Sequence, residues 1–455
     1  MAAAEGQFQA ITKATVSITD ADKVRKEAEL LLKPEAKWEE LLMPAAISVA
    51  ILGELACNSV RHKDDVSINK NCPTDAFKSI ERPGSFRACL DQVNMQAWGA
   101  FNEVYQIDTR SRYVSGKLTD IMQSFFQNAQ VGKNQLLRVK QKIQDEAEKC
   151  RKSAQEMKDK FLEVILLVKE LSQACQNASH GYEKDLNDVK MALDQAKNQG
   201  KSVSKAMGEA RQKQMQAEGE MKEAFKEFWE AVNFSPTSWY DGGSDVSNKI
   251  ELLKKQLSKV EGETLRQSHK EDKRSFENII KLIKEMQNIL CEIKENEMKE
   301  KDLETARKML IEGQGALEKV EQQWEKMVQF FQVISNLIEF CFNWHIQECS
   351  ASAEGVQQIT HAFNASSVAQ LVNLLFETYN QVRENYMKIL ASSSRILTKE
   401  LSDPSFDSEC AEIKIGCTKA KTATSELLLE RKDEFKKNFN ARLETIEKMK
   451  AMQHP

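Results

Sequence analysis

Residues 147–182 read AEKCRKSAQEMKDKFLEVILLVKELSQACQNASHGY, and the spacing of their apolar side chains decides the fold class. These side chains recur in alternating steps of three and four, as Ala147, Cys150, Ala154, Met157, Phe161, Val164, Val168, Leu171, Cys175, Ala178 and Tyr182. After one extra step of four, the series continues through Leu186, Val189, Leu193 and Ala196. A seven-residue repeat places apolar groups on one stripe of an α-helix, whereas a strand needs a two-residue period. The extra step predicts a local unwinding of a supercoil.

A second apolar series of the same period lies further along the chain. It consists of Leu303, Ala306, Leu310, Gly313, Leu317, Val320, Trp324, Met327, Phe331, Ile334, Ile338, Cys341 and His345, of which Gly313 and His345 are the weakest members. Between the two series, residues 234–245 read FSPTSWYDGGSD, and their Pro, Gly, Ser and Asp content predicts a turn. We therefore expect two long antiparallel helical arms. At the tip, Trp239 and Tyr240 either pack on a neighbour or form an exposed aromatic anchor at a membrane interface.

The distribution of proline supports long helices. The chain of 455 residues holds 7 Pro and 17 Gly, and no Pro occurs between Pro83 and Pro236 or between Pro236 and Pro404. Proline inside a helix is destabilising by about 3 kcal/mol, so these long proline-free stretches are what long helices require. The predicted fold class is all-α, an elongated bundle of long antiparallel heptad-patterned helices.

The same features predict five segments. They are N-terminal shorter helices over 1–110, a first long arm over 111–233, the turn at 234–245, a second long arm over 246–350, and C-terminal helices over 351–455 that complete the bundle. Gly181, Gly200, Gly208 and Gly219 are candidate places for a kink or fold-back in the first arm. Within the last segment we expect one helix over about 356–401 and another that starts at Asp403 and Pro404, a suitable N-cap and first helical residue.

Charge and cysteine content narrow the class of protein. Lys and Arg number 65 and Asp and Glu 69, and the two signs mix over short distances, as solvated helix faces do. No basic stripe suited to phosphate backbones follows from this mixture, so nucleic acid is not an expected partner. The start, MAAAEGQFQA, lacks the pattern of a secretory signal. Together with ten cysteines and no CxxC pair, this favours a cytoplasmic protein as synthesised. Export without an N-terminal signal, or peripheral membrane association, stays open.

No motif of an enzyme occurs in the chain. The phosphate-binding, zinc-hydrolase and serine-hydrolase signatures are absent, so we expect no catalytic residues, no cofactor and no small-molecule substrate. Cys341, His345 and Cys349 share one helix face, and His361 would come near them if the chain folds back between them. Four such ligands could hold zinc. Because Cys341 and His345 already belong to the second apolar series, the expectation is that no metal binds.

The most unusual segment runs from Val328 to Phe376. Its 49 residues hold three charged side chains, Glu339, Glu348 and Glu354, and no Lys or Arg. It predicts two weakly polar helices of about bilayer length, joined by residues 348–355. The segment could occupy the centre of a bundle or form the interface of a homo-oligomer. It could also be an amphitropic hairpin, which is buried in the soluble bundle and becomes exposed to lipid at a membrane. Polar residues such as Gln329, Gln332 and Asn336 are unfavourable in lipid unless they are paired.

A shorter apolar stretch, Leu41 to Gly53, contains no charge. It is too short to span a bilayer by itself, and it suits either a core helix or an element that enters a membrane, with Pro44 near its start. The candidate membrane-interaction residues in both stretches are apolar: Ile47, Val49, Ile51, Leu52, Phe330, Phe331, Ile334, Ile338, Phe340, Phe342, Val368, Leu371, Leu374 and Leu375.

Leu41 to Gly53, the two apolar series and Val328 to Phe376 together resemble the layout of the α-helical pore-forming proteins of the cytolysin A and haemolysin BL type. The resemblance implies a soluble helical bundle that releases an apolar element, inserts it into a membrane and oligomerises. The chain departs from that family at residues 234–245, because a polar turn stands where the family's main apolar element lies.

The sequence thus favours an amphitropic helical protein that permeabilises or binds membranes through residues 328–376 and oligomerises. The alternative is a non-enzymatic cytosolic coiled-coil scaffold. The expected partners are membrane lipid and either further copies of the chain or the helices of other proteins.

Overall fold

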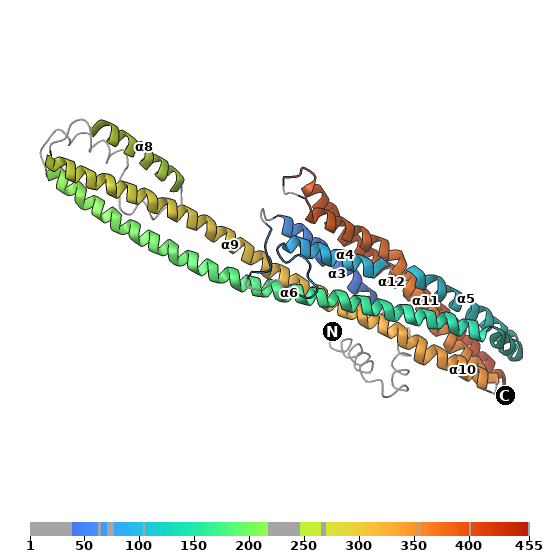
Figure 1. Cartoon of the computed structure of the whole chain (residues 1–455). Helices are drawn as coiled ribbons and strands as arrows, with labels where there is room; N and C mark the ends of the chain where they lie inside the picture. The colour runs from blue at the N-terminus through green and yellow to red at the C-terminus, as the bar shows by residue number, and fades with distance from the viewer. Residues whose placement is uncertain are drawn as a thin grey trace. The chain divides into compact units, whose positions relative to one another are not determined.

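The computed structural model describes residues 39–61, 65–70, 77–102, 105–216, 246–264, 270–352, 355–399 and 402–453. Regular structure in these ranges is helical throughout, with no strand (Figure 1). The elements are α3 (Glu39–Val60), α4 (Phe86–Asn102), α5 (Tyr105–Gln127), α6 (Ala129–Gln216), α8 (Val246–Thr264), α9 (Lys270–Asn336), the π-helix η3 (Leu337–Phe342), α10 (Asn343–Ala351), α11 (Gly355–Leu397) and α12 (Phe406–Gln453). The all-α fold class is confirmed. Trp239, Tyr240 and the rest of the turn at 234–245 lie outside the described residues.

The chain divides into two compact units. The first comprises residues up to Asn177 together with Leu310 onward, and the second comprises Ala178–Met309. Two ion pairs show that α6 and α9 are antiparallel in the first unit. Lys169 Nζ pairs with Glu321 at 3.2 Å, and Arg151 pairs with Glu339 at 3.6 Å. The residue number therefore falls along α6 as it rises along the partner segment of chain that begins with α9.

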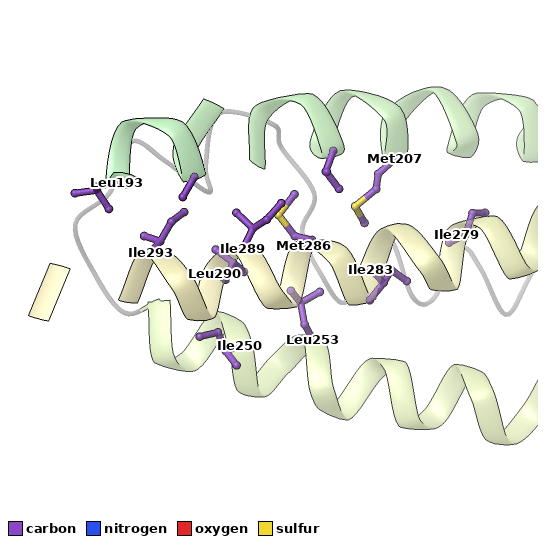
Figure 2. Packing of buried hydrophobic residues seen from close by; sticks show 12 residues of the cluster. Leu193, Met207, Ile250, Leu253, Ile279, Ile283, Met286, Ile289, Leu290 and Ile293 are labelled. Carbon is purple, nitrogen blue, oxygen red and sulfur yellow. The ribbon is translucent and has the colours of Figure 1, made fainter. Parts of the chain in front are cut away.

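The second unit shows the same antiparallel order. Arg307 pairs with Glu183 at 3.2 Å, and Lys190 pairs with Glu300 at 3.8 Å. Its core joins three helices (Figure 2), with Leu193, Ala196, Val203 and Met207 from α6, Ile250 and Leu253 from α8, and Ile279, Ile283, Met286, Ile289, Leu290 and Ile293 from α9. Both apolar series therefore bury their stripe against partner helices, as heptad spacing requires.

In the first unit, α11 packs against α3, α4, α5 and α12. Aromatic side chains fill the centre: the rings of Phe161 and Phe331 lie 5.8 Å apart, and Phe101 contacts both Phe161 at 5.3 Å and Tyr386 at 5.8 Å. The predicted series are buried apart from a few half-buried members near their ends in the second unit, namely Tyr182, Val189, Leu303 and Ala306.

The chain folds back at Asn128 and not at the glycines to which the sequence pointed. Asn128 Oδ1 accepts hydrogen bonds from the backbone N–H groups of Gln130 and Val131 at 2.9 and 3.2 Å, which caps the start of α6. Ser124 Oγ donates to Gln135 Oε1 at 2.7 Å, so α5 returns along α6. Gly181, Gly200 and Gly208 all lie inside the continuous helix α6, while Gly219 lies outside the described residues.

Two predicted helix starts are displaced. α3 begins at Glu39, so Pro44 lies within the helix and not at its first residue. α12 begins at Phe406, two residues after Pro404, because Asp403 Oδ1 accepts the backbone N–H of Ser405 at 2.9 Å in a turn that precedes the helix. The Ser405 carbonyl then accepts the N–H of Glu409 at 3.0 Å, which makes Ser405 the N-cap.

Candidate functional site

The helix α3 is the most apolar element in the described part of the chain. Within that part, its residues Glu40–Val60 form the one helix that is long and apolar enough to cross a membrane, and 72% of its apolar window is buried. The core helix of a soluble protein can have the same length and composition. Residues 328–376 do not reach this level of hydropathy, because their low charge is combined with many Gln, Asn, Ser and Thr side chains.

α3 lies in close contact with α12. A Cβ atom added to Gly53 would lie 2.9 Å from Ile413 Cγ2 and 3.2 Å from Cys417 Sγ, so the absent side chain allows the two helices to approach. One further turn along α3, the Cys57 thiol is hydrogen-bonded to that of Cys410, and burial together with this contact raises the pKa of Cys57 to about 12. Residue numbers rise along α3 as they fall along α12, which makes the two helices antiparallel.

The two buried hydroxyls of α3 are satisfied within the helix itself. Ser48 and Ser59 are fully buried, and their hydroxyls donate to the carbonyls of Ala45 at 2.9 Å and Ala56 at 2.8 Å. These bonds would persist wherever the helix moves, including into lipid, where backbone and hydroxyl groups must be satisfied internally. Among the candidate residues of α3, Val49 and Leu52 are buried, and Ile47 and Ile51 are half-buried.

The low-charge segment 328–376 comprises the end of α9, η3, α10 and the first half of α11. α10 ends at Ala351 with Ser352 as its C-cap, and α11 begins at Gly355, so both helix ends fall within the join predicted at residues 348–355. The candidate residues Phe330, Phe331, Ile334, Ile338, Phe342, Val368, Leu371 and Leu375 are buried, and Phe340 and Leu374 are half-buried. η3 borders a small cavity lined by Ile338 and Phe342 and by residues of α5, α6 and α11. A π-helix within an α-helix marks a local departure from ideal packing.

Polar side chains of this segment bond to the surrounding helices. Lys158 Nζ donates to Gln332 Oε1 at 2.9 Å, and Gln332 Nε2 donates to Asn336 Oδ1 at 2.9 Å. On α11, Asn373 Oδ1 accepts from Ser111 at 3.2 Å, and Gln370 Nε2 donates to Thr119 at 3.1 Å. These bonds compensate for burying amides and help to hold the segment inside the bundle.

The end of the segment at which α10 leads into α11, here called its closed end, brings together His345 and His361. Their Nδ1 atoms lie 3.1 Å apart, and the ring of Trp344 contacts both imidazoles, with centroids at 4.7 and 5.1 Å. Cys349 Sγ donates to the Gln358 carbonyl at 3.3 Å. Although His361 does approach His345, no group of three or more His, Cys, Asp or Glu side chains in the described residues is arranged to hold a metal ion.

No sequence pattern indicates the contact between Cys57 and Cys410. The two residues are far apart in the chain and belong to helices whose pairing no periodicity specifies. The fold-back at Asn128 did have a local signal, an Asn at a suitable N-cap position, which the proline and glycine pattern obscured.

No known protein family matches the chain, and no curated protein matches it. A solved structure that it resembles is the SmhB pore of the tripartite α-pore-forming toxin Smh from Serratia marcescens, at 11% identity and a TM-score of 0.20, covering 83% of this chain and 98% of that chain. A TM-score this low limits the resemblance to helical architecture, and no residue role transfers from it.

Proposed function

We propose that the protein is amphitropic, a soluble helical bundle that exposes α3 and the low-charge segment 328–376 to a membrane, and that it assembles there with further copies of itself. The observation that carries this proposal is the packing of α3 against α11. The helix with the length and composition of a membrane span is stored against the helix that carries half of the low-charge segment.

α3 is suited to leave the bundle. Its buried Ser48 and Ser59 hydroxyls are bonded within the helix, so they stay satisfied when the helix departs. Its apolar surface would exchange burial in protein for burial in lipid, which makes the transfer close to balanced. The surface charge of the bundle keeps the stored state soluble.

Departure of α3 would uncover the face of α11 that it covers. That face lies around Ile389, beyond the low-charge segment. The segment itself is rich in amides and hydroxyls, for which lipid is a poor environment unless the polar groups pair with one another. Pairing between copies of the chain would meet that requirement. The proposed activity therefore combines membrane entry by α3 with self-association through residues 328–376, and it needs no catalytic residue or cofactor.

The bonds from Lys158 to Gln332 and from Ser111 to Asn373 favour a second candidate. They suit a permanent core, in which case the protein is a cytosolic scaffold whose long helices bind partner helices. The two candidates differ in a measurable way, because a scaffold keeps α3 and residues 328–376 buried in every state.

The test is flotation and dye release with vesicles of phosphatidylcholine and phosphatidylglycerol, comparing the wild type with Ile51→Asp. Ile51 is half-buried, so a carboxylate there is tolerated better in the soluble fold than at a buried position. A charge at the centre of a membrane helix is unfavourable by about 2.5–3.5 kcal/mol, so we expect vesicle binding and release to fall by about tenfold or more.

The matched control is Ile415→Asp on α12, where the side chain is 53% exposed. This variant should bind and permeabilise vesicles like the wild type, and thermal melts should show that both variants are folded. Absence of binding and release by the wild type under all lipid compositions would reject the proposal in favour of the scaffold.

A further inference from the structure

The closed end of the low-charge segment contains a pair of titratable groups that the proposed function does not use. His345 on α10 is buried and His361 on α11 is half-buried, and their Nδ1 atoms face one another at 3.1 Å. Two neutral imidazoles can make this contact when one ring donates its proton to the lone pair of the other. Two imidazolium rings cannot, because both Nδ1 atoms then carry hydrogen and both rings are cationic.

The surroundings of the pair contain charges of both signs. Glu348 on α10 favours protonation of His361. On α6, Lys133 and Lys140 lie near Cys349, one turn after His345, and Lys133 Nζ donates to the Ser352 carbonyl at 3.2 Å. On α12, Arg442 Nη1 lies 3.5 Å from Ser366 Oγ, five residues beyond His361. Of these charges, Glu348 acts on His361 directly and favours its protonation, while the neighbouring ring of His345 opposes it.

The direction of the linkage follows from the environment of His361. Burial, and then the neighbouring His345, hold the pKa of His361 below its ordinary value of 6.5. An imidazole released to solvent binds a proton more readily than one held in the closed pair. Stability of the closed pair is therefore fully present above about pH 6.5, and it is lost as the pH falls through that value toward the lowered pKa.

We propose that His345 and His361 form an acid-sensitive latch between α10 and α11, which opens the end of the low-charge segment when acid breaks the contact between the two rings. As a trigger for membrane entry the latch rests on the proposed function, but its opening in the absence of lipid does not. The latch acts together with other bonds at the same place, including those from Cys349 to Gln358 and from Lys133 to Ser352.

The first measurement is hydrogen exchange of residues 343–362 without lipid, from about pH 7.5 to about pH 5, corrected for the intrinsic exchange rate. Wild-type protection should fall with pH, by up to about tenfold for each unit that separates the pKa values of the open and closed forms. His361→Asn should flatten this dependence, because its amide can still donate to His345 while it does not titrate. His361→Phe, which keeps the ring volume, provides a second variant if the first folds poorly.

The control is His180→Phe, which removes an exposed histidine of α6 and should leave the pH dependence unchanged. Protection that is independent of pH in the wild type, or equal pH dependence in the wild type and both His361 variants, would overturn the latch.

Dye release from the same phosphatidylcholine and phosphatidylglycerol vesicles separates this inference from the proposed function. Release that rises in acid for the wild type and not for His361→Asn supports both. Acid opening without release at any pH keeps the latch and rejects the membrane activity. Release without acid opening rejects the latch alone.

Discussion

Gly313, the weakest apolar position of the second series, is explained at the scale of single atoms. A Cβ atom there would lie 2.6 Å from Cζ of the buried Phe86 ring, which packs from α4 against the backbone of α9. The space left by the absent side chain is occupied by the Phe86 ring. A series that is broken by glycine on the sequence is continuous in space, because Phe86 supplies the apolar atoms that residue 313 lacks.

The substitution Gly313→Ala should destabilise the protein. Overpacking against an immobile ring is unfavourable by about 1–3 kcal/mol, while the higher helix propensity of Ala recovers up to about 1 kcal/mol. We expect a net loss of up to about 2 kcal/mol in chemical denaturation.

The control for this substitution is Gly315→Ala in the same helix, two residues away, where an added Cβ meets nothing within 4 Å. It should be neutral or stabilising by up to about 1 kcal/mol. Equal effects of the two substitutions would show that Phe86 does not occupy the space above residue 313.

Between single residues and the whole chain, the contact of α3 with α12 determines how firmly the apolar helix is held. Gly53 lies at the closest approach, against Ile413, Cys417 and Ile389. Because this contact involves branched side chains on two helices, a larger residue at position 53 would push α3 outward.

Gly53→Val should therefore weaken the docking of α3 by about 1–3 kcal/mol. Thermal melting should occur at lower temperature, and vesicle binding should need less protein, because the stored state is less stable relative to the membrane-bound state. Gly99→Val in α4, where an added Cβ meets nothing within 4 Å, provides the comparison for the change in helix propensity alone, which favours Val over Gly. A lower melting temperature without increased vesicle binding would argue that α3 is a permanent core helix.

For the molecule as a whole, the reactivity of the buried cysteines toward an alkylating reagent measures whether the interior opens. Burial raises the pKa of Cys57, Cys89, Cys150 and Cys349 to about 12 in each case. At neutral pH these side chains are almost entirely neutral thiols, and alkylation requires the thiolate. Cys291 is half-buried and is the most accessible of the cysteines in the described ranges.

Alkylation of the native protein at about pH 8, followed by peptide mass spectrometry, should therefore modify Cys291 first among the cysteines of the described ranges and leave those four protected. With vesicles present, the amphitropic proposal expects Cys57 and Cys349 to become reactive, since they lie on α3 and in the low-charge segment, while Cys150 on α6 serves as an internal reference. A scaffold would keep all of these buried cysteines protected with and without vesicles.

Particular residues show how far sequence alone could lead. The series from Ala147 to Tyr182 specified helix because apolar groups at seven-residue spacing can be buried together only on a helical stripe. The low charge of residues 328–376 indicated burial, because few of their side chains carry charges that water must solvate. The approach of His361 to His345 could be anticipated because both flank one join in the chain.

Other features depended on contacts between segments that are distant in sequence. Which helix covers α3 could not be inferred, because heptad spacing says that a stripe is buried and not what covers it. The fold-back at Asn128 depended on a single capping side chain whose signal is weaker than that of proline or glycine. The sequence by itself thus determined local periodicity and composition, which act through neighbouring residues. The tertiary structure alone decided the partners of each helix, because packing selects among many apolar stripes of similar hydrophobicity by the shape of their side chains.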